Sequence, residues 1–246
     1  MNVDSTDFLS AGFFITKRVH RSSYNSPDLL PENLLSASEC ICTFVPDTWC
    51  VAWTGDTPEL RWEKAKVFAL DPEALARLTD HVTSRFEVSF GWPNVCFSLA
   101  AAREIVQGLL TDRKDVVVFE LGLHKQFMEA FLKAAEPPPS PPGHAPMGRQ
   151  GVLEMILKEL PLAAGGIPLG FEPLVFYYSL SDSWLCNGLE TVFHDRLGLT
   201  PNAQGFIASL EEALRGVELL WEGKVAAEPG LWLPWLILDH TRSTGP

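Results

Sequence analysis

The sequence predicts a fold that combines helices and strands, either α/β or α+β, with helices flanking a mixed sheet. Short runs rich in Val, Ile, Phe and Trp alternate with segments whose apolar residues recur at the spacing of one helix face. The chain is 46% hydrophobic and 20% charged, which provides ample apolar surface for a core. No apolar run is long enough to span a membrane. The run Phe8–Ile15 is too short and interrupted for a signal peptide.

In the first half of the chain, helices are expected to alternate with short strands. Asp71-Pro72-Glu73 is a strong helix start, because a cap residue precedes proline at the first helical position. Ser98 is expected to cap a further helix. Val116–Phe119 is continuously apolar, which predicts a central strand. The expected helices cover residues 27–38, 71–86, 98–110 and 125–135, and the expected strands lie within residues 40–53, 95–97 and 116–119.

Proline-rich sequence separates this half from the rest. The run Pro137–Gly143 is typical of an extended, solvated linker. The sequence therefore suggests an N-terminal lobe at residues 1–136, a linker or loop at 137–148, and a C-terminal lobe at 149–246. A single sheet that crosses the linker is an equal alternative, because the second lobe offers few strands of its own.

The C-terminal lobe has the clearest local signals. After a helix at residues 152–160, a strand is expected at Leu174–Tyr178 and a helix at residues 183–197, ended by Gly198. Ser209 and Glu212 form a capping box for a second helix, which ends at Gly223. Its predicted buried face consists of Leu210, Leu214, Val217 and Trp221. The apolar run 231–238 predicts a strand, placed at a sheet edge or across a bulge because Pro234 lacks a backbone donor.

The helix at 183–197 carries the candidate site. Its polar side would present five residues as a binding surface: Trp184, Asn187, Glu190, Thr191 and His194. Glu190 and His194 are one turn apart, and a carboxylate that orients an imidazole is a recurrent general-base arrangement. They are therefore the candidate catalytic pair. The plainer interpretation is a solvated helix face on which this pair adds a few tenths of a kcal/mol.

The cysteines indicate neither a disulfide framework nor a metal site. The chain has five, at positions 40, 42, 50, 96 and 186. This odd number without a leader favours reduced thiols and a cytoplasmic location. Cys40 and Cys42 are closer together than zinc ligands usually are, so no metal or cofactor is expected. Cys186 could act as a nucleophile only if the fold brought His81, His124 or His240 to it.

The net charge of the chain limits the kinds of partner that it can bind. The net charge is −12, and it is spread over both halves of the chain. An acidic surface makes nucleic acid an unfavourable partner and favours rapid association with a basic protein. Solubility alone would also explain the charge.

Three functions from different classes fit these observations. No phosphate loop, nucleophile elbow or dinucleotide fingerprint is present, so the first is a non-enzymatic, immunity-like protein that masks a basic partner such as a toxin or effector. The second is a hydrolase-like enzyme that acts on a small molecule through His194 and Glu190. The third is a structural subunit that forms a homo-oligomer through the segment Trp232–Trp235.

Overall fold

The computed structural model describes residues 3–20, 29–38, 71–73, 76, 95–108, 110, 113–135, 151–176 and 181–241. The strands predicted within 40–53, the proline-rich segment at 137–148, His81, Cys40, Cys42 and Cys50 lie outside these residues. Pro72 and Glu73 are helical, as predicted, and the rest of the helix expected there is also outside them.

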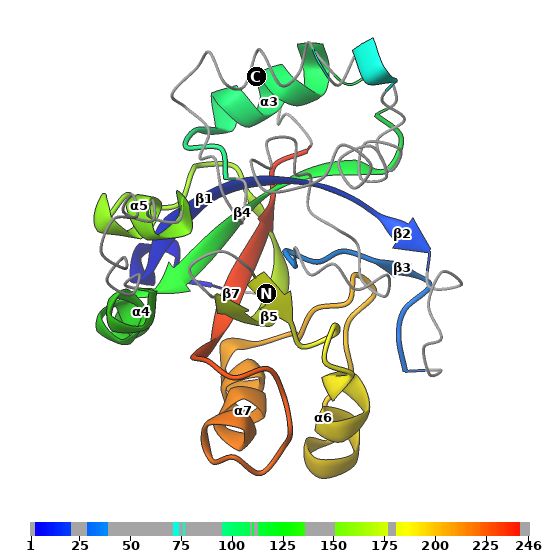
Figure 1. The fold of residues 1–246 in the computed structure, drawn as a ribbon, viewed down its shortest axis with the longest axis vertical. Helices are drawn as coiled ribbons and strands as arrows, with labels where there is room; N and C mark the ends of the chain where they lie inside the picture. Colours follow the sequence, from blue (N-terminus) through cyan, green and yellow to red (C-terminus); the bar gives the residue numbers. More distant parts are fainter. Residues whose placement is uncertain are drawn as a thin grey trace, which may run out of the picture.

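A curled five-stranded sheet forms the centre of the molecule (Figure 1). Its order is β1-β4-β7-β5-β6, so strands from before and after residues 137–148 belong to one sheet. The predicted combination of helices and strands is confirmed, but every strand pair is antiparallel, whereas a mixed sheet was expected. The strands are β1 (Phe8–Lys17), β4 (Val116–His124), β5 (Ile167–Phe176), β6 (Ser181–Ser183) and β7 (Trp232–Asp239), with β2 (Val19–His20) and β3 (Asn33–Leu34) paired separately.

Pro234 lies within β7, in the middle of the sheet, and the prediction of an edge position is wrong. It faces Pro173 of β5. The Pro173 carbonyl accepts a hydrogen bond from the Trp184 backbone N–H, so the backbone groups of Pro173 point away from β7. The two prolines therefore form a non-hydrogen-bonded pair, and the Pro234 nitrogen faces the side of β4. The last pair of the β4–β7 ladder joins Leu123 to Trp235, the residue next to Pro234. No hydrogen bond of that ladder is therefore lost at Pro234.

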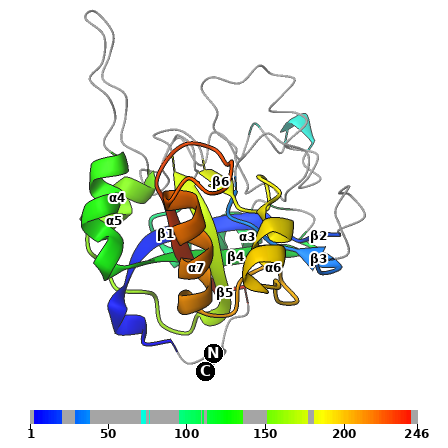
Figure 2. The ribbon, with the colours of Figure 1, turned by 90° about the horizontal axis from the view of Figure 1, so that it is seen from below.

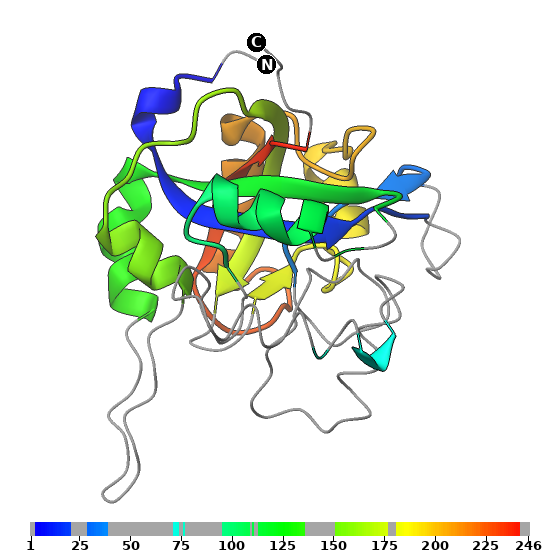
Figure 3. The same ribbon diagram turned by 90° about the horizontal axis from the view of Figure 1, so that it is seen from above.

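Helices cover both faces of the sheet (Figures 1 and 2). The helices α6 (Leu189–Leu197) and α7 (Leu210–Trp221) pack on the face that carries Phe171, Val175 and Leu236. The opposite face, with Leu121, Leu174 and Trp235, packs against α4 (Met128–Ala135) and α5 (Gly151–Leu157). Figure 3 shows α3 (Leu99–Gly108) in front of β1 and β4, where Ile105 is buried with Phe13 and Val118. Two short 3₁₀ turns, η1 (Ser5–Asp7) and η3 (Lys125–Phe127), precede β1 and α4.

The helix predicted at 183–197 begins later than expected. Residues 181–183 form β6, a turn follows, and α6 starts at Leu189. Gly188 has a φ of 62°, which interrupts a right-handed helix. The Ser183 hydroxyl accepts a hydrogen bond from the Leu185 backbone N–H at 3.1 Å, so it stabilises this turn and not a helix start. The predicted end at Gly198 is confirmed, since that residue has a φ of 68° and donates to the His194 carbonyl.

Residues 29–38 contain a turn followed by the short strand β3, and the helix predicted at 27–38 is not present there. Pro31 disfavours a helix interior, and the backbone bonds to distant segments instead. The Leu35 N–H donates to the Gln204 carbonyl, and the Ser36 carbonyl accepts from the Thr16 hydroxyl.

Half of the predicted capping box of α7 is present, because the Glu212 side chain accepts from the Ser209 hydroxyl and not from the Ser209 backbone N–H. The Ser209 hydroxyl oxygen accepts a hydrogen bond from the Glu212 backbone N–H at 3.2 Å. The predicted buried face is only partly right, because Ala213, Gly216 and Val217 are the buried residues and Trp221 is 45% exposed. Phe193 of α6 packs directly over Gly216, so the small residues of α7 face its neighbour. The Trp221 ring therefore remains partly exposed to solvent.

Candidate functional site

The five residues of the predicted binding surface do not form one solvent-facing patch. Trp184 is fully buried and stacks on Phe193, with 5.4 Å between ring centroids. Asn187 uses its amide structurally: Nδ2 donates to the Ser183 carbonyl, and Oδ1 accepts from the Glu228 backbone N–H. Trp184 therefore stabilises the core in this conformation and offers no ring to a partner.

The predicted acid–base pair is separated, although its members are one helical turn apart. His194 Nδ1 lies 3.3 Å from Asp195 Oδ1, and the His194 side chain is 43% exposed. Glu190 is buried in the first turn of α6, and burial raises its pKa. Its Oε2 atom has no hydrogen-bond partner among the described residues. Thr191 is exposed on the same helix.

The other candidates considered from the sequence, which are Cys186, His240 and the segment Trp232–Trp235, also lie in contacts within the fold. Cys186 Sγ lies 2.9 Å from the Ser38 hydroxyl oxygen. His240 Nε2 lies 2.9 Å from Glu120 Oε2, and both side chains are buried. Trp232 and Trp235 are buried within β7, so this segment presents no surface for the homo-oligomer contact suggested by the sequence.

Glu172 of β5 holds a distant part of the chain against the sheet. Its carboxylate is fully buried and accepts hydrogen bonds from the Ser183 hydroxyl at 2.7 Å, the Ala37 backbone N–H at 2.9 Å and the Ser36 hydroxyl. Burial raises the pKa of Glu172 to about 7, against the opposing effect of these three donors. No cavity adjoins this cluster among those described, so Glu172 acts as a structural tie.

Glu120 and His240 form a second buried tie between elements. Besides contacting His240, the Glu120 carboxylate accepts a hydrogen bond from the Ala163 backbone N–H at 3.1 Å. The His240 ring is in edge contact with Phe13 and lies against Gly166, where a Cβ atom would be 2.8 Å from Nε2. The pair therefore fixes the loop before β5 to the end of β7.

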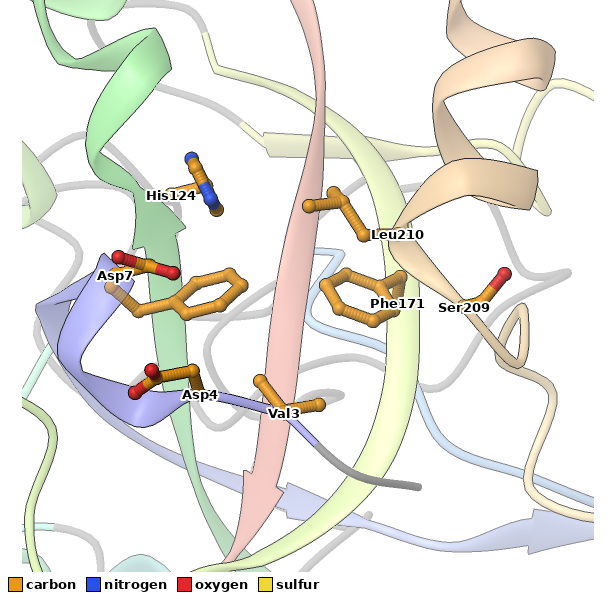
Figure 4. A pocket seen from close by; sticks show the side chains of 8 residues that line it. Val3, Asp4, Asp7, His124, Phe171, Ser209 and Leu210 are labelled. Carbon is orange, nitrogen blue, oxygen red and sulfur yellow. The ribbon is translucent and has the colours of Figure 1, made fainter.

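A pocket of about 210 Å³ opens between η1, the end of β4 and the start of α7 (Figure 4). Phe8 and Phe171, whose centroids lie 6.2 Å apart, form its buried floor. Figure 4 shows His124 and Asp7 on one side of the pocket and Leu210 and Phe171 on the other. Val3, Asp4 and Ser209 complete the lining.

His124 is held in a defined orientation at the pocket wall. Its Nδ1 atom accepts a hydrogen bond from the Gln126 backbone N–H, so in the neutral ring the proton is on Nε2. Partial burial lowers the pKa of His124, and the negative charge of Asp7 opposes this effect. His124 is therefore mainly neutral at neutral pH.

The pocket lacks an activated nucleophile. Ser209 supplies a hydroxyl, but its oxygen caps α7 and its proton is directed to Glu212 Oε2 at 3.1 Å. Because the Ser209 hydroxyl already donates one hydrogen bond and accepts another, it is not positioned to attack a substrate with His124 as the base. The acidic and aromatic lining is therefore better suited to binding than to hydrolysis.

Aromatic rings continue from this pocket to the exposed end of α7. His124 contacts Phe8 with 5.0 Å between centroids and Phe127 with 6.1 Å, and Phe127 contacts Trp221 with 6.4 Å. Trp221 Nε1 donates to the Trp232 carbonyl, so its polar atom is satisfied internally and its ring is left half exposed. We call these four residues, Phe8, His124, Phe127 and Trp221, the aromatic strip.

Sequence reasoning missed this site because its residues come from separate segments. Asp4 and Asp7 lie near the N-terminus, His124 is the last residue of β4, and Ser209 caps α7. Each gives a local signal, for example Ser209 as a helix cap, but no spacing relates them to each other. Only the antiparallel pairing of β1 with β4, which places Phe8 opposite His124, brings them together.

Two further observations concern the residues that the structure describes. No three His, Cys, Asp or Glu side chains among them gather closely enough to hold a metal ion. None of their helices combines the length and apolar character needed to cross a bilayer.

Comparisons of the chain with protein-family models, curated proteins and solved structures find no match.

Proposed function

We propose that the chain is a non-enzymatic binding protein that masks a basic protein partner. The observation that carries this proposal is Trp221, a half-exposed tryptophan on an acidic helix. Tryptophan is strongly enriched among residues that dominate binding energy.

The surroundings of Trp221 favour a basic partner. Glu211, Glu218 and Glu222 are exposed along α7. Two nearby basic side chains are engaged within the chain: Arg215 donates to the Leu197 carbonyl, and Lys224 Nζ pairs with Glu222 at 2.5 Å. The net charge of −12 would add long-range attraction. The partner would thus contact the exposed end of the aromatic strip at Trp221, with basic residues beside the carboxylates of α7.

The proposal is tested with the tagged chain, purified from its own host at low salt and examined by native mass spectrometry. The wild-type chain should carry a stoichiometric basic protein that dissociates at high salt, because exposed charge pairs are screened. Trp221→Ala should lose this protein, since truncating an anchor of this kind costs about 2 kcal/mol or more.

Leu157→Ala provides a matched control. Leu157 is 44% exposed, which is close to the exposure of Trp221, but it lies on α5 on the opposite face of the sheet. This variant should retain the partner. Equal retention by Trp221→Ala, or a wild-type chain that carries no protein at low salt, would contradict the proposal.

A further inference from the structure

We infer that the pocket between η1 and α7 binds a cationic group the size of one side chain, the guanidinium of arginine or the ammonium of lysine. The inference rests on the proposed function in assigning that group to a partner protein. The pocket volume of about 210 Å³ is below the range of roughly 300 to 1,000 Å³ that is typical of cofactor and drug sites. It suits a side chain better than a whole small molecule.

The charges around the pocket favour a cation. Asp4 and Asp7 line it, and both side chains are exposed enough to meet an entering group. Hydrogen bonds from the Thr6 backbone N–H and hydroxyl lower the pKa of Asp4, so this carboxylate is ionised throughout the neutral range. Lys125 is the opposing charge, and its Nζ atom donates to the Thr6 carbonyl at 2.6 Å, outside the pocket lining.

The start of α7 must be weighed against this conclusion, because helix N-termini attract anions. Here the Ser209 hydroxyl already satisfies the Glu212 backbone N–H. Glu211 and Glu212 also place two carboxylates in the first turn. These groups occupy the positive end of the helix, so the net field at the pocket is set by carboxylates.

The floor of the pocket fits the same ligand. The Phe8 and Phe171 side chains line the pocket but are only 3% and 2% exposed, so they offer an apolar wall with little open ring face. The methylene stem of an arginine or lysine side chain can pack on such a wall while its charged head stays beside the carboxylates. The carboxylates at the mouth therefore distinguish a cation from a neutral group of equal shape.

The test is a titration with Nα-acetyl-arginine amide, followed by the amide resonances of the ¹⁵N-labelled full chain. Nα-acetyl-citrulline amide, which has the same shape without the charge, is the control ligand. Arginine amide should produce saturable shifts near Asp7, His124 and Leu210, and citrulline amide should not. Asp7→Asn should weaken binding about tenfold, the lower end for a hydrogen bond to a charged group.

Two further variants separate the pocket from general surface charge. Glu129→Gln removes one exposed carboxylate of α4 that does not line the pocket, and it should leave the affinity nearly unchanged. Lys125→Gln removes the opposing charge and should strengthen binding.

Equal binding of the two amides, no saturable shift, or preferential binding of inorganic phosphate would overturn the inference. If the titration failed while Trp221→Ala still abolished partner capture, only the pocket assignment would fall. If arginine amide bound but no basic protein was captured at low salt, only the proposed function would fall.

Discussion

At the scale of single residues, Glu172 has the most direct consequence for stability. Its folded-state pKa is about 7, against an ordinary value of 4.5 for a glutamate side chain. Between these two values the folded state retains a proton that the unfolded chain has released. The free energy of unfolding therefore falls as pH rises through this window, by roughly 3 kcal/mol at most. The stability is fully present below about pH 4.5 and is lost as pH passes about 7.

Glu172→Gln should remove this dependence. The glutamine oxygen can accept from the Ala37 backbone N–H while its amide nitrogen donates to the Ser36 and Ser183 hydroxyl oxygens, and the side chain does not ionise. Urea unfolding of the wild type and the variant at several pH values between about 5 and about 8 would measure the difference in slope. Glu129→Gln, an exposed position on α4, is the control and should behave as the wild type. Parallel profiles for Glu172→Gln and wild type would contradict the assignment.

At the scale of elements, the contact between α6 and α7 depends on the absence of a side chain at Gly216. A Cβ atom placed there would lie 2.6 Å from the Phe193 ring, closer than packed atoms approach. Gly216→Ala should therefore destabilise the protein by about 1 to 3 kcal/mol through overpacking, although alanine by itself favours a helix by about 1 kcal/mol.

A second substitution tests this explanation. Phe193→Leu replaces the ring that would clash with the new methyl group by a smaller side chain. The double variant should therefore lose less unfolding free energy than the two single variants lose in sum. Thermal or urea unfolding of all four proteins would give the coupling energy. Strict additivity would show that the two residues do not meet in the way described.

Elements with local signals were predicted well from the sequence. Ser209 and Ser98 each cap the helix expected of them, and Val116–Phe119 lies inside a buried, paired strand. The errors occurred where distant groups decide local structure. Ser183 serves the buried Glu172 and a turn, and Pro234 is accepted within β7 because its nitrogen faces the side of β4, whose ladder with β7 ends at Trp235. Neither partner can be found by inspecting the neighbouring sequence.

The same distinction applies to the candidate site. Helical spacing placed Glu190 and His194 within reach, but it could not show that Glu190 is buried or that His194 faces Asp195. The pocket joins residues from segments more than a hundred positions apart. Its assembly follows from strand order, which the periodicity of one segment does not contain.

At the scale of the whole molecule, the central pairing of β4 with β7 joins the two halves of the sequence. Residues 119–123 pair with residues 235–239, and α5 packs against β1. If a protease site is introduced within residues 137–148 and cleaved after folding, the two fragments should therefore remain associated. Size-exclusion chromatography would show co-elution in buffer and separation in urea. Fragments that separate in buffer would indicate independent lobes at 1–136 and 149–246.

The position of β7 also determines when the protein can acquire its structure during synthesis. The ribosome makes β1, β4, β5 and β6 before β7, yet β7 lies between β4 and β5. Until β7 has left the exit tunnel, a nascent chain can form the β1–β4 and β5–β6 pairs, but it has no strand to connect them. The exposed inner edges of β4 and β5 are then open to mispairing. Completion of the sheet must therefore wait until β7 has left the exit tunnel.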